Sequence, residues 1–291
     1  MAAFRGTNAF DDFSAFGNSG GIVSDPPGLT ALTHDGDLIL AYGGDDTVFA
    51  GNGADTILGG AGDDYISAGE GGQDVVYGEA GRDSIFLAWG GGGYAHGGAG
   101  NDDLYGDVGD ATLIGGNGWD SLFGGEGDEL MIGGAGDDLL SGWGGRDLIR
   151  GGAGDDTLAA GYGGARDTLI GGAGDDEFRL NDDWFATAAE RIGVGLIRAA
   201  DDSSVPAFEG AGAAQGDRID LRFIDANRLT AVDEPFIFGG RGAGHFWLEE
   251  RGTRTLVLMN TDASEAAEFR IAIDDGAVRA SDYTLEDFIL L

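Results

Sequence analysis

Aspartate recurs at a fixed place in a nine-residue pattern, and its carboxylate is the group in this sequence best suited to chemistry. Clear copies of the pattern are Gly133–Ser141 and Gly151–Ala159, which follow G-G-x-G-x-D-x-U-x, where U is a large apolar residue. Glycines at positions one, two and four favour a tight turn whose backbone carbonyls point at one spot. The sixth-position carboxylate, Asp138 or Asp156, adds a charged oxygen beside those carbonyls. Oxygen ligands on a flexible loop suit a hard cation, and calcium better than magnesium.

The pattern fills fifteen consecutive blocks from Ala41 to Arg179, and a weaker copy containing Asp37 precedes them at Leu32–Leu40. The fourth and sixth blocks each carry one extra residue, and the fourteenth carries two. This region holds 42 of the 59 glycines. So much glycine without a period would indicate a disordered linker. A linker would not keep an aspartate and an aliphatic residue in register, so the period predicts a folded repeat.

The elements that position the carboxylates are predicted to be short strands at positions seven to nine of each block. The eighth residue points inward, and fourteen of the fifteen are large and apolar, with Ala95 as the exception. One block cannot bury its own apolar residue, whereas stacked blocks bury a continuous row of them. The sequence therefore predicts an all-β protein built around a solenoid.

The blocks resemble the haemolysin-type calcium-binding repeats of the RTX family. The resemblance implies a parallel β-roll, a nonapeptide solenoid in which two consecutive blocks make one coil. It also implies calcium ions between turns two blocks apart on the same edge, about seven to ten in all. These ions would offset part of the formal net charge of −36, which arises from 52 acidic and 16 basic residues.

If consecutive turns alternate between two edges, the odd- and even-numbered blocks supply separate rows of candidate calcium ligands. The odd row is unbroken and consists of Asp46, Asp64, Asp83, Asp102, Asp120, Asp138, Asp156 and Asp176. The even row has Asp55 and Asp74, then Gly93, Ala111 and Glu129, then Asp147 and Asp167. We therefore expect a complete calcium column on the odd edge and calcium sites only near the ends of the even edge.

The outward positions of the even-block strands are largely apolar, with Leu58, Tyr94 and Ile132 among them. A continuous apolar outer sheet is unusual unless something covers it. Two alternatives follow from this pattern. Either the N- or C-terminal segment packs on the sheet, or the sheet serves self-association or binds a surface or matrix partner.

Three regions are predicted: an N-terminal cap with one degenerate repeat at 1–40, the β-roll at 41–179, and a C-terminal domain at 180–291. Strand-like runs separated by turn signals predict a small antiparallel β C-terminal cap. These runs are Arg218–Ile224, Pro235–Phe238, His245–Glu249, Arg254–Met259 and Glu268–Ile273.

Two C-terminal segments, Gly216–Leu221 and Ser281–Leu291, resemble the C-terminal domain of serralysin-type secreted metalloproteases. That resemblance implies an uncleaved type I secretion signal at the extreme C-terminus, where an acidic residue precedes apolar ones. The residues Phe288–Leu291 are also compatible with a last β-strand.

Composition and missing motifs exclude several classes of protein. The strong acidity is incompatible with a basic nucleic-acid footprint, and no apolar run approaches the roughly 20 residues of a membrane span. The chain has no cysteine for disulfides or thiolate metal sites, and Met1–Arg5 does not begin a conventional signal peptide. It contains neither His-Glu-x-x-His nor Gly-x-Ser-x-Gly, and its three histidines lie far apart. We therefore expect that the chain is not an enzyme.

Together these features predict a secreted, extracellular protein that binds calcium, folds after type I export and has no catalytic activity. Its predicted partners are calcium ions and the type I secretion machinery. The favoured role is structural or adhesive, at the cell surface or in an extracellular matrix. The alternatives are a small secreted effector or toxin, and an accessory calcium-binding module of an enzyme system.

Overall fold

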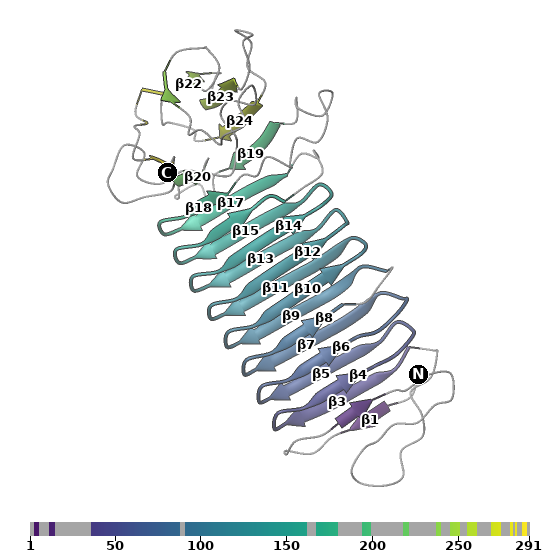
Figure 1. Cartoon of the computed structure of the whole chain (residues 1–291). Helices are drawn as coiled ribbons and strands as arrows, with labels where there is room; N and C mark the ends of the chain where they lie inside the picture. The colour runs from purple at the N-terminus through teal and green to yellow at the C-terminus, as the bar shows by residue number, and fades with distance from the viewer. Residues whose placement is uncertain are drawn as a thin grey trace, which may run out of the picture. The chain divides into compact units, whose positions relative to one another are not determined.

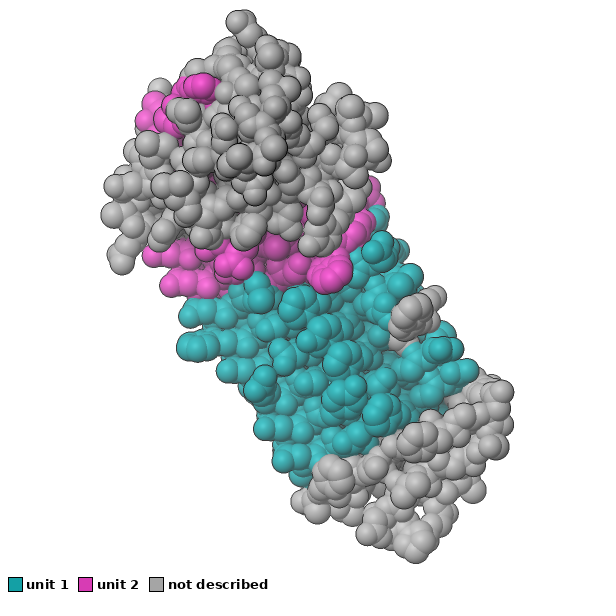
Figure 2. Space-filling view, in the orientation of Figure 1, with its two compact units in different colours: residues 1–139 teal, residues 140–291 magenta. Residues whose placement is uncertain are grey.

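The computed structural model describes most of the repeat region and short pieces of the two ends. The described residues are 3–5, 12–14, 36–87, 91–161, 167–179, 194–198, 218–220, 237–239, 245–250, 255–260, 269–274, 280–281, 283 and 287–289. The chain divides into two compact units, residues 1–139 (unit 1) and 140–291 (unit 2), which Figure 2 shows in different colours. All the elements assigned in these residues are β-strands. Within the described ranges, no helix offers a membrane-spanning length of apolar residues.

Unit 1 is a parallel β-solenoid whose successive strands alternate between two sheets (Figure 1). The first sheet contains, in spatial order, β1 (Ala3–Arg5), β3 (Leu38–Gly43), β5 (Thr56–Ala61), β7 (Asp74–Ala80), β9 (Gly93–Ala99), β11 (Ala111–Asn117) and β13 (Leu130–Ala135). The second contains β2 (Asp12–Ser14), β4 (Thr47–Phe49), β6 (Tyr65–Ser67), β8 (Ser84–Phe86), β10 (Asp103–Asp107) and β12 (Ser121–Gly125). Two consecutive blocks therefore make one coil, as predicted.

Unit 2 continues the same alternation and then adds antiparallel strands. The boundary between the units falls within β14 (Leu139–Trp143). One sheet of unit 2 contains, in spatial order, β15 (Leu148–Ala153), β17 (Thr168–Ala173), β19 (Val194–Arg198), β24 (Phe269–Asp274), β23 (Thr255–Asn260), β22 (His245–Glu250) and β21 (Ile237–Phe238). The other contains β16 (Thr157–Ala159), β18 (Glu177–Arg179), β20 (Arg218–Asp220) and β25 (Phe288–Ile289).

The predicted fold class, a parallel β-roll followed by a small antiparallel part, is confirmed. Strands β22, β23 and β24 pair antiparallel and fall where the sequence predicted strands. They do not form a separate sheet, because β24 pairs in parallel with β19, which itself pairs with β17 of the roll. The predicted last strand is also present as β25, which pairs with β20. Most of the two segments with the serralysin resemblance lies outside the described residues.

The core of the roll is the row of eighth-position side chains. They lie directly opposite one another in neighbouring strands, as in the pairs Ile57–Val76 and Leu104–Leu122. All fifteen are at most 1% exposed, including Ala95. This register is kept although some blocks are longer, since β5 and β7 pair Thr56 with Val75, 19 residues apart. The extra residues are therefore absorbed in the even-block turns and do not displace the core.

The strands of the two sheets differ in length, which the sequence did not predict. Most strands of the second sheet span positions seven to nine, as β6 and β8 do. Strands of the first sheet run on through the first three positions of the next block and reach six or seven residues, as in β5 and β11. The odd-block turn therefore begins inside a hydrogen-bonded strand, which holds its backbone more firmly than a loop would.

Outward side chains form rows on both sheets of unit 1. On the first sheet, the apolar residues Leu58, Tyr94 and Ile132 are half-buried. The terminal segment that was one predicted cover for this face lies mostly outside the described residues. The second sheet carries a row of aromatic rings in which each contacts the next, with centroids 4.6–5.7 Å apart: Phe49, Tyr65, Phe86, Tyr105 and Phe123.

Glycine is required in the turns because they stack backbone on backbone. In the block that begins at Gly59, the second and fourth glycines, Gly60 and Gly62, have φ of +115° and +132°. A Cβ on Gly60 would lie 2.0 Å from the carbonyl oxygen of Tyr42 in the turn two blocks earlier. The first glycine, Gly59, does not have positive φ, so our expectation that it supplies unusual backbone angles was wrong. Gly59 is instead required because there is no space for a side chain at this position.

Substitution of two glycines tests this stacking. Gly60→Ala should reduce the free energy of unfolding by at least ~3 kcal/mol, because the new methyl group would strike a stacked backbone carbonyl as well as strain φ. Gly71→Ala, at φ +77° with nothing within 4 Å of the new Cβ, should cost only about 1 kcal/mol. Urea unfolding in the presence of calcium measures both. Equal losses in the two variants would contradict close turn stacking as the reason for glycine.

Candidate metal centre

All twelve predicted ligand residues are buried, and they lie in the turns or, for Asp74, at the start of strand β7. Each is at most 3% exposed: Asp46, Asp55, Asp64, Asp74, Asp83, Asp102, Asp120, Asp138, Asp147, Asp156, Asp167 and Asp176. A buried carboxylate is costly unless it is hydrogen-bonded and compensated by positive charge. The turns therefore bury acidic groups that would be exposed to water in an ordinary surface loop.

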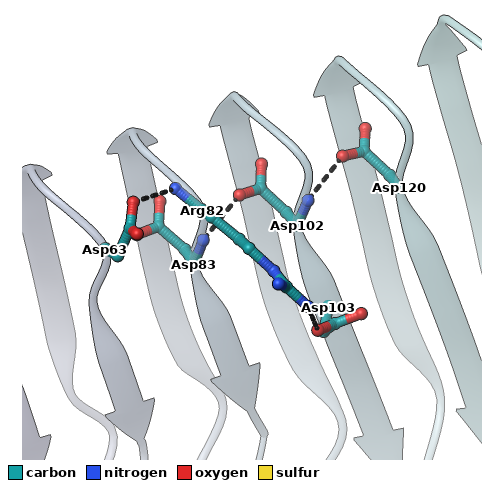
Figure 3. A network of polar contacts seen from close by, with 6 residues as sticks. All are labelled: Asp63, Arg82, Asp83, Asp102, Asp103 and Asp120. Carbon is teal, nitrogen blue, oxygen red and sulfur yellow. Dashed lines mark hydrogen bonds and ion pairs between the residues drawn. The ribbon is translucent and has the colours of Figure 1, made fainter.

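The buried aspartates form ladders along each edge. The backbone N–H of one sixth-position residue donates to Oδ1 of the aspartate in the next turn on the same edge, as from Asp83 to Asp102 and from Asp102 to Asp120, both at 2.8 Å (Figure 3). On the odd edge of unit 1 the ladder is continuous from Asp46 to Asp138. In unit 2 the corresponding bond joins Asp156 N to Asp176 Oδ1 at 3.0 Å.

The even edge has a broken ladder, in line with its sequence. In unit 1 the backbone N–H of Asp55 donates to Oδ1 of Asp74 at 2.8 Å. The next residue in this register is Gly93, which has no carboxylate to continue the row. In unit 2 the N–H of Asp147 donates to Asp167 at 2.9 Å. In unit 1 the structure therefore arranges the odd-block aspartates as a continuous row and the even-block aspartates as an interrupted one, and the role of all twelve predicted residues as ligands stays a prediction.

Where a block begins with glycine, the second carboxylate oxygen of its sixth-position aspartate faces that glycine. Oδ2 of Asp64, Asp83, Asp102 and Asp120 is buried without a hydrogen-bond partner. A Cβ on Gly78 would lie 2.2 Å from Oδ2 of Asp83 and 2.7 Å from the carbonyl oxygen of Gly97 in the next turn. The absence of a side chain at Gly78 therefore leaves a small space that is bordered by a carboxylate oxygen and a carbonyl oxygen.

These oxygens fit a hard cation. Charged and neutral oxygens in one loop are the donors that calcium prefers. Within the part of the chain that the structure describes, no group of three or more His, Cys, Asp or Glu side chains could hold a metal ion by itself. Backbone carbonyls would therefore have to supply the remaining ligands, as the glycine positions suggested.

Burial raises the pKa of these carboxyl groups. The pKa of Asp55, Asp64 and Asp120 rises from 3.8 to about 6, and that of Asp83, Asp102 and Asp138 to about 7. Desolvation is the largest cause, the backbone hydrogen bond opposes it, and repulsion from neighbouring aspartates adds to it. In the absence of a cation, ionisation of these rows therefore works against the fold.

Two features of the site were missed at the level of sequence. Asp37 of the weak preceding copy is fully buried, and its backbone N–H donates to Oδ1 of Asp55 at 2.6 Å, which extends the even row. A second, exposed ladder runs through position five in the opposite direction: the N–H of Asp63 donates to Oδ1 of Asp45 in the preceding turn at 2.9 Å. The same bond joins Trp119 N to Asn101 Oδ1. The sequence signal that could have predicted this second ladder is the recurrence of short side chains with an acceptor oxygen at position five.

The repeat region matches a known family. The family described as RTX calcium-binding nonapeptide repeat (4 copies) matches residues 40–72, 67–93, 96–128, 123–158 and 162–183. This region of the chain therefore consists of RTX calcium-binding nonapeptide repeats, and repeats of this family bind calcium ions. The matched segments span the predicted β-roll and end at residue 183, so most of the C-terminal region is not matched.

Among solved structures, the solution structure of the AlgE6R3 subunit from the Azotobacter vinelandii mannuronan C5-epimerase is similar. It is 20% identical, with 65% of this chain and 78% of that chain covered and a TM-score of 0.22. No curated protein matches the chain.

The raised pKa values predict how the calcium-free chain responds to pH. Because the folded-state values of about 6 to 7 lie above the ordinary 3.8, the folded state binds more protons between about pH 4 and 7. Stability should therefore be highest near pH 4 and fall as the pH rises through 7. Circular dichroism in chelator across this range measures the β content.

The matched variant for this experiment is Asp102→Asn, which keeps an Oδ1 acceptor and loses the titrating group. It should show a smaller loss of β structure at pH 8 than the parent chain. Asp45→Asn makes the same change at an exposed position and serves as the control. A calcium-free chain that gains structure as the pH rises from 4 to 8 would contradict the proposed cost of the buried charges.

Proposed function

We propose that the chain is a secreted, non-enzymatic protein whose repeat region folds when calcium bridges successive turns. The observation that carries this proposal is the row of buried aspartates on the odd edge of unit 1. In five of them, Asp64, Asp83, Asp102, Asp120 and Asp138, a backbone N–H of a neighbouring turn holds one carboxylate oxygen. The second oxygen of Asp64, Asp83, Asp102 and Asp120 has no hydrogen-bond partner in the structure. Bound calcium would compensate this charge, so that binding energy becomes folding energy.

Secretion is part of the proposal because it explains why folding of the aspartate rows would depend on calcium. At low calcium, repulsion between ionised aspartates opposes stacking of the turns, and an unstacked chain suits transport through a channel. Extracellular calcium-binding modules have dissociation constants near 10⁻⁴–10⁻³ M, in the range where calcium outside the cell would load the turns. The C-terminal resemblance to serralysin-type proteins supports export by a type I system. The chain has no cysteine, so stabilisation outside the cell would come from calcium instead of disulfides.

The two ends are proposed to cap the roll, as residues 1–40 and 180–291. Caps are needed because an open end exposes unpaired strand edges. Strands β1 and β2 support this role, since they pair with β3 and β4 and thereby continue both sheets at the N-terminal end of unit 1. In unit 2, β19 and β20 continue both sheets beyond β17 and β18 in the same way.

The folding step is tested by circular dichroism with chelator and during a calcium titration. We expect little β structure in chelator at pH 7.5 and a cooperative gain as calcium approaches millimolar concentrations. Magnesium is the control and should produce little change, because it demands a small octahedral site and gives up its water reluctantly. A chain with equal β content in chelator and in calcium would refute the proposal.

The proposed role outside the cell is structural or adhesive. It is supported by the half-buried apolar outer face of the first sheet in unit 1, defined by Leu58, Tyr94 and Ile132. Light scattering should then show oligomers in calcium that dissociate in chelator, and Leu58→Asp with Ile132→Asp should abolish them without loss of β structure. Calcium-dependent leakage of lipid vesicles would favour an effector or toxin instead. Co-purification with a secreted enzyme would favour an accessory module.

A further inference from the structure

Arg82 is the one basic residue in the eight odd-block turns of the sequence. It occupies position five, directly before the buried Asp83. Its backbone N–H donates to Oδ1 of Asp63 in the preceding turn at 2.8 Å. Its guanidinium reaches the next strand of the same sheet, β10, and donates from Nη2 to Oδ2 of Asp103 at 3.4 Å (Figure 3). Arg82 thus contacts the preceding turn through its backbone and the following strand through its guanidinium.

The two carboxylates that Arg82 contacts are among those whose charges reach the buried row. The charge of Asp63 raises the pKa of Asp83 and Asp102, and the charge of Asp103 raises that of Asp102 and Asp120. The guanidinium places a positive charge beside Asp103 and in the same turn as Asp83, and this charge weakens the negative field along the row. In the calcium-free chain this reduces repulsion, whereas toward a divalent cation it reduces attraction.

We propose that Arg82 is a resident counter-charge of the odd edge, which supports the calcium-free turns around Asp83 and Asp102 and lowers their affinity for calcium. This inference rests on the proposed calcium-dependent folding. It assigns Arg82 an electrostatic role beyond an exposed ion pair, because the Arg82–Asp103 contact alone contributes little stability at a surface. The calcium sites of the odd edge then differ in affinity, although every odd turn carries an aspartate.

Arg82 has a second effect that must be separated from its charge. A guanidinium carries donors and no acceptor, so Arg82 cannot accept the N–H of Asn101 as Asp45 accepts that of Asp63. The position-five ladder is therefore interrupted at Arg82 for reasons unrelated to electrostatics. Arg82→Met removes the charge and leaves the ladder interrupted. Arg82→Asn removes the charge and restores an acceptor.

The experiment is a calcium titration of the full chain, followed by circular dichroism and calorimetry at 20 mM and 300 mM NaCl. Arg82→Met should lower the midpoint calcium concentration about two-fold at low salt, with a smaller shift at high salt because the interaction is screened. The same variant should have less β structure than the parent in chelator at pH 6.5, where the carboxyl groups of Asp83 and Asp102 begin to ionise. Asp103→Asn, which leaves the guanidinium uncompensated, should raise the midpoint.

Arg179→Met is the control, since it makes the same change in net charge and removes a half-buried arginine that pairs at 2.6 Å with Glu177 of its own strand, β18, and does not bridge successive coils. It should leave the midpoint unchanged. If Arg82→Met and Arg179→Met shift the midpoint equally, or if Arg82→Met raises it, the local role of Arg82 is wrong. An effect seen only in Arg82→Asn would assign the residue to the ladder and also overturn the proposal. Loss of calcium response in the parent chain would instead refute the proposed function itself.

Discussion

The repeat region depends on one conflict, between close stacking of the turns and the charge that each turn carries. Stacking is enforced by glycines such as Gly60, whose missing Cβ lets the backbone approach the carbonyl of Tyr42. The same stacking buries an aspartate in every odd turn, and burial raises the pKa of Asp64, Asp83, Asp102, Asp120 and Asp138. The hydrogen bond from the neighbouring N–H satisfies only one carboxylate oxygen. We infer that protons or cations must offset this charge for the stacked fold to be stable, and this is why we link stability to calcium.

The roll and its core could be predicted because they depend on a period. Position eight has the same role in every block, and position six has the same role in every odd block. The sequence therefore shows an inward residue in register from Val48 to Phe178 and an aspartate in each odd turn. Even Ala95 is buried in its place, because the strands on either side fix the register. The division of the aspartates into two rows was also accessible, since it follows from alternation of the turns between edges.

Other features could not be predicted because they depend on neighbours 18 to 20 residues away. The first glycine resembles the second in sequence, yet Gly78 is required by the carboxylate of Asp83 and not by its φ angle. The ladder at position five depends on which side chain lies in the adjacent turn. Tyr42 and Trp143 have positive φ where other blocks have glycine, which no local rule for aromatic residues would suggest. Each is a property of stacked pairs of turns.

The two kinds of row in unit 1 complement each other. On the even edge the carboxylate ladder stops at Asp74, because Gly93 and Ala111 have no acidic side chain. Through the same stretch the second sheet carries the stacked rings from Phe49 to Phe123. Ring centroids 4.6 Å apart with parallel planes, as for Phe86 and Tyr105, place the rings face to face, so each coil is held to the next without any cation. We therefore attribute the cohesion of this stretch to a cation-dependent odd edge and a cation-independent aromatic row, so that a gap in one row of carboxylates does not divide the roll.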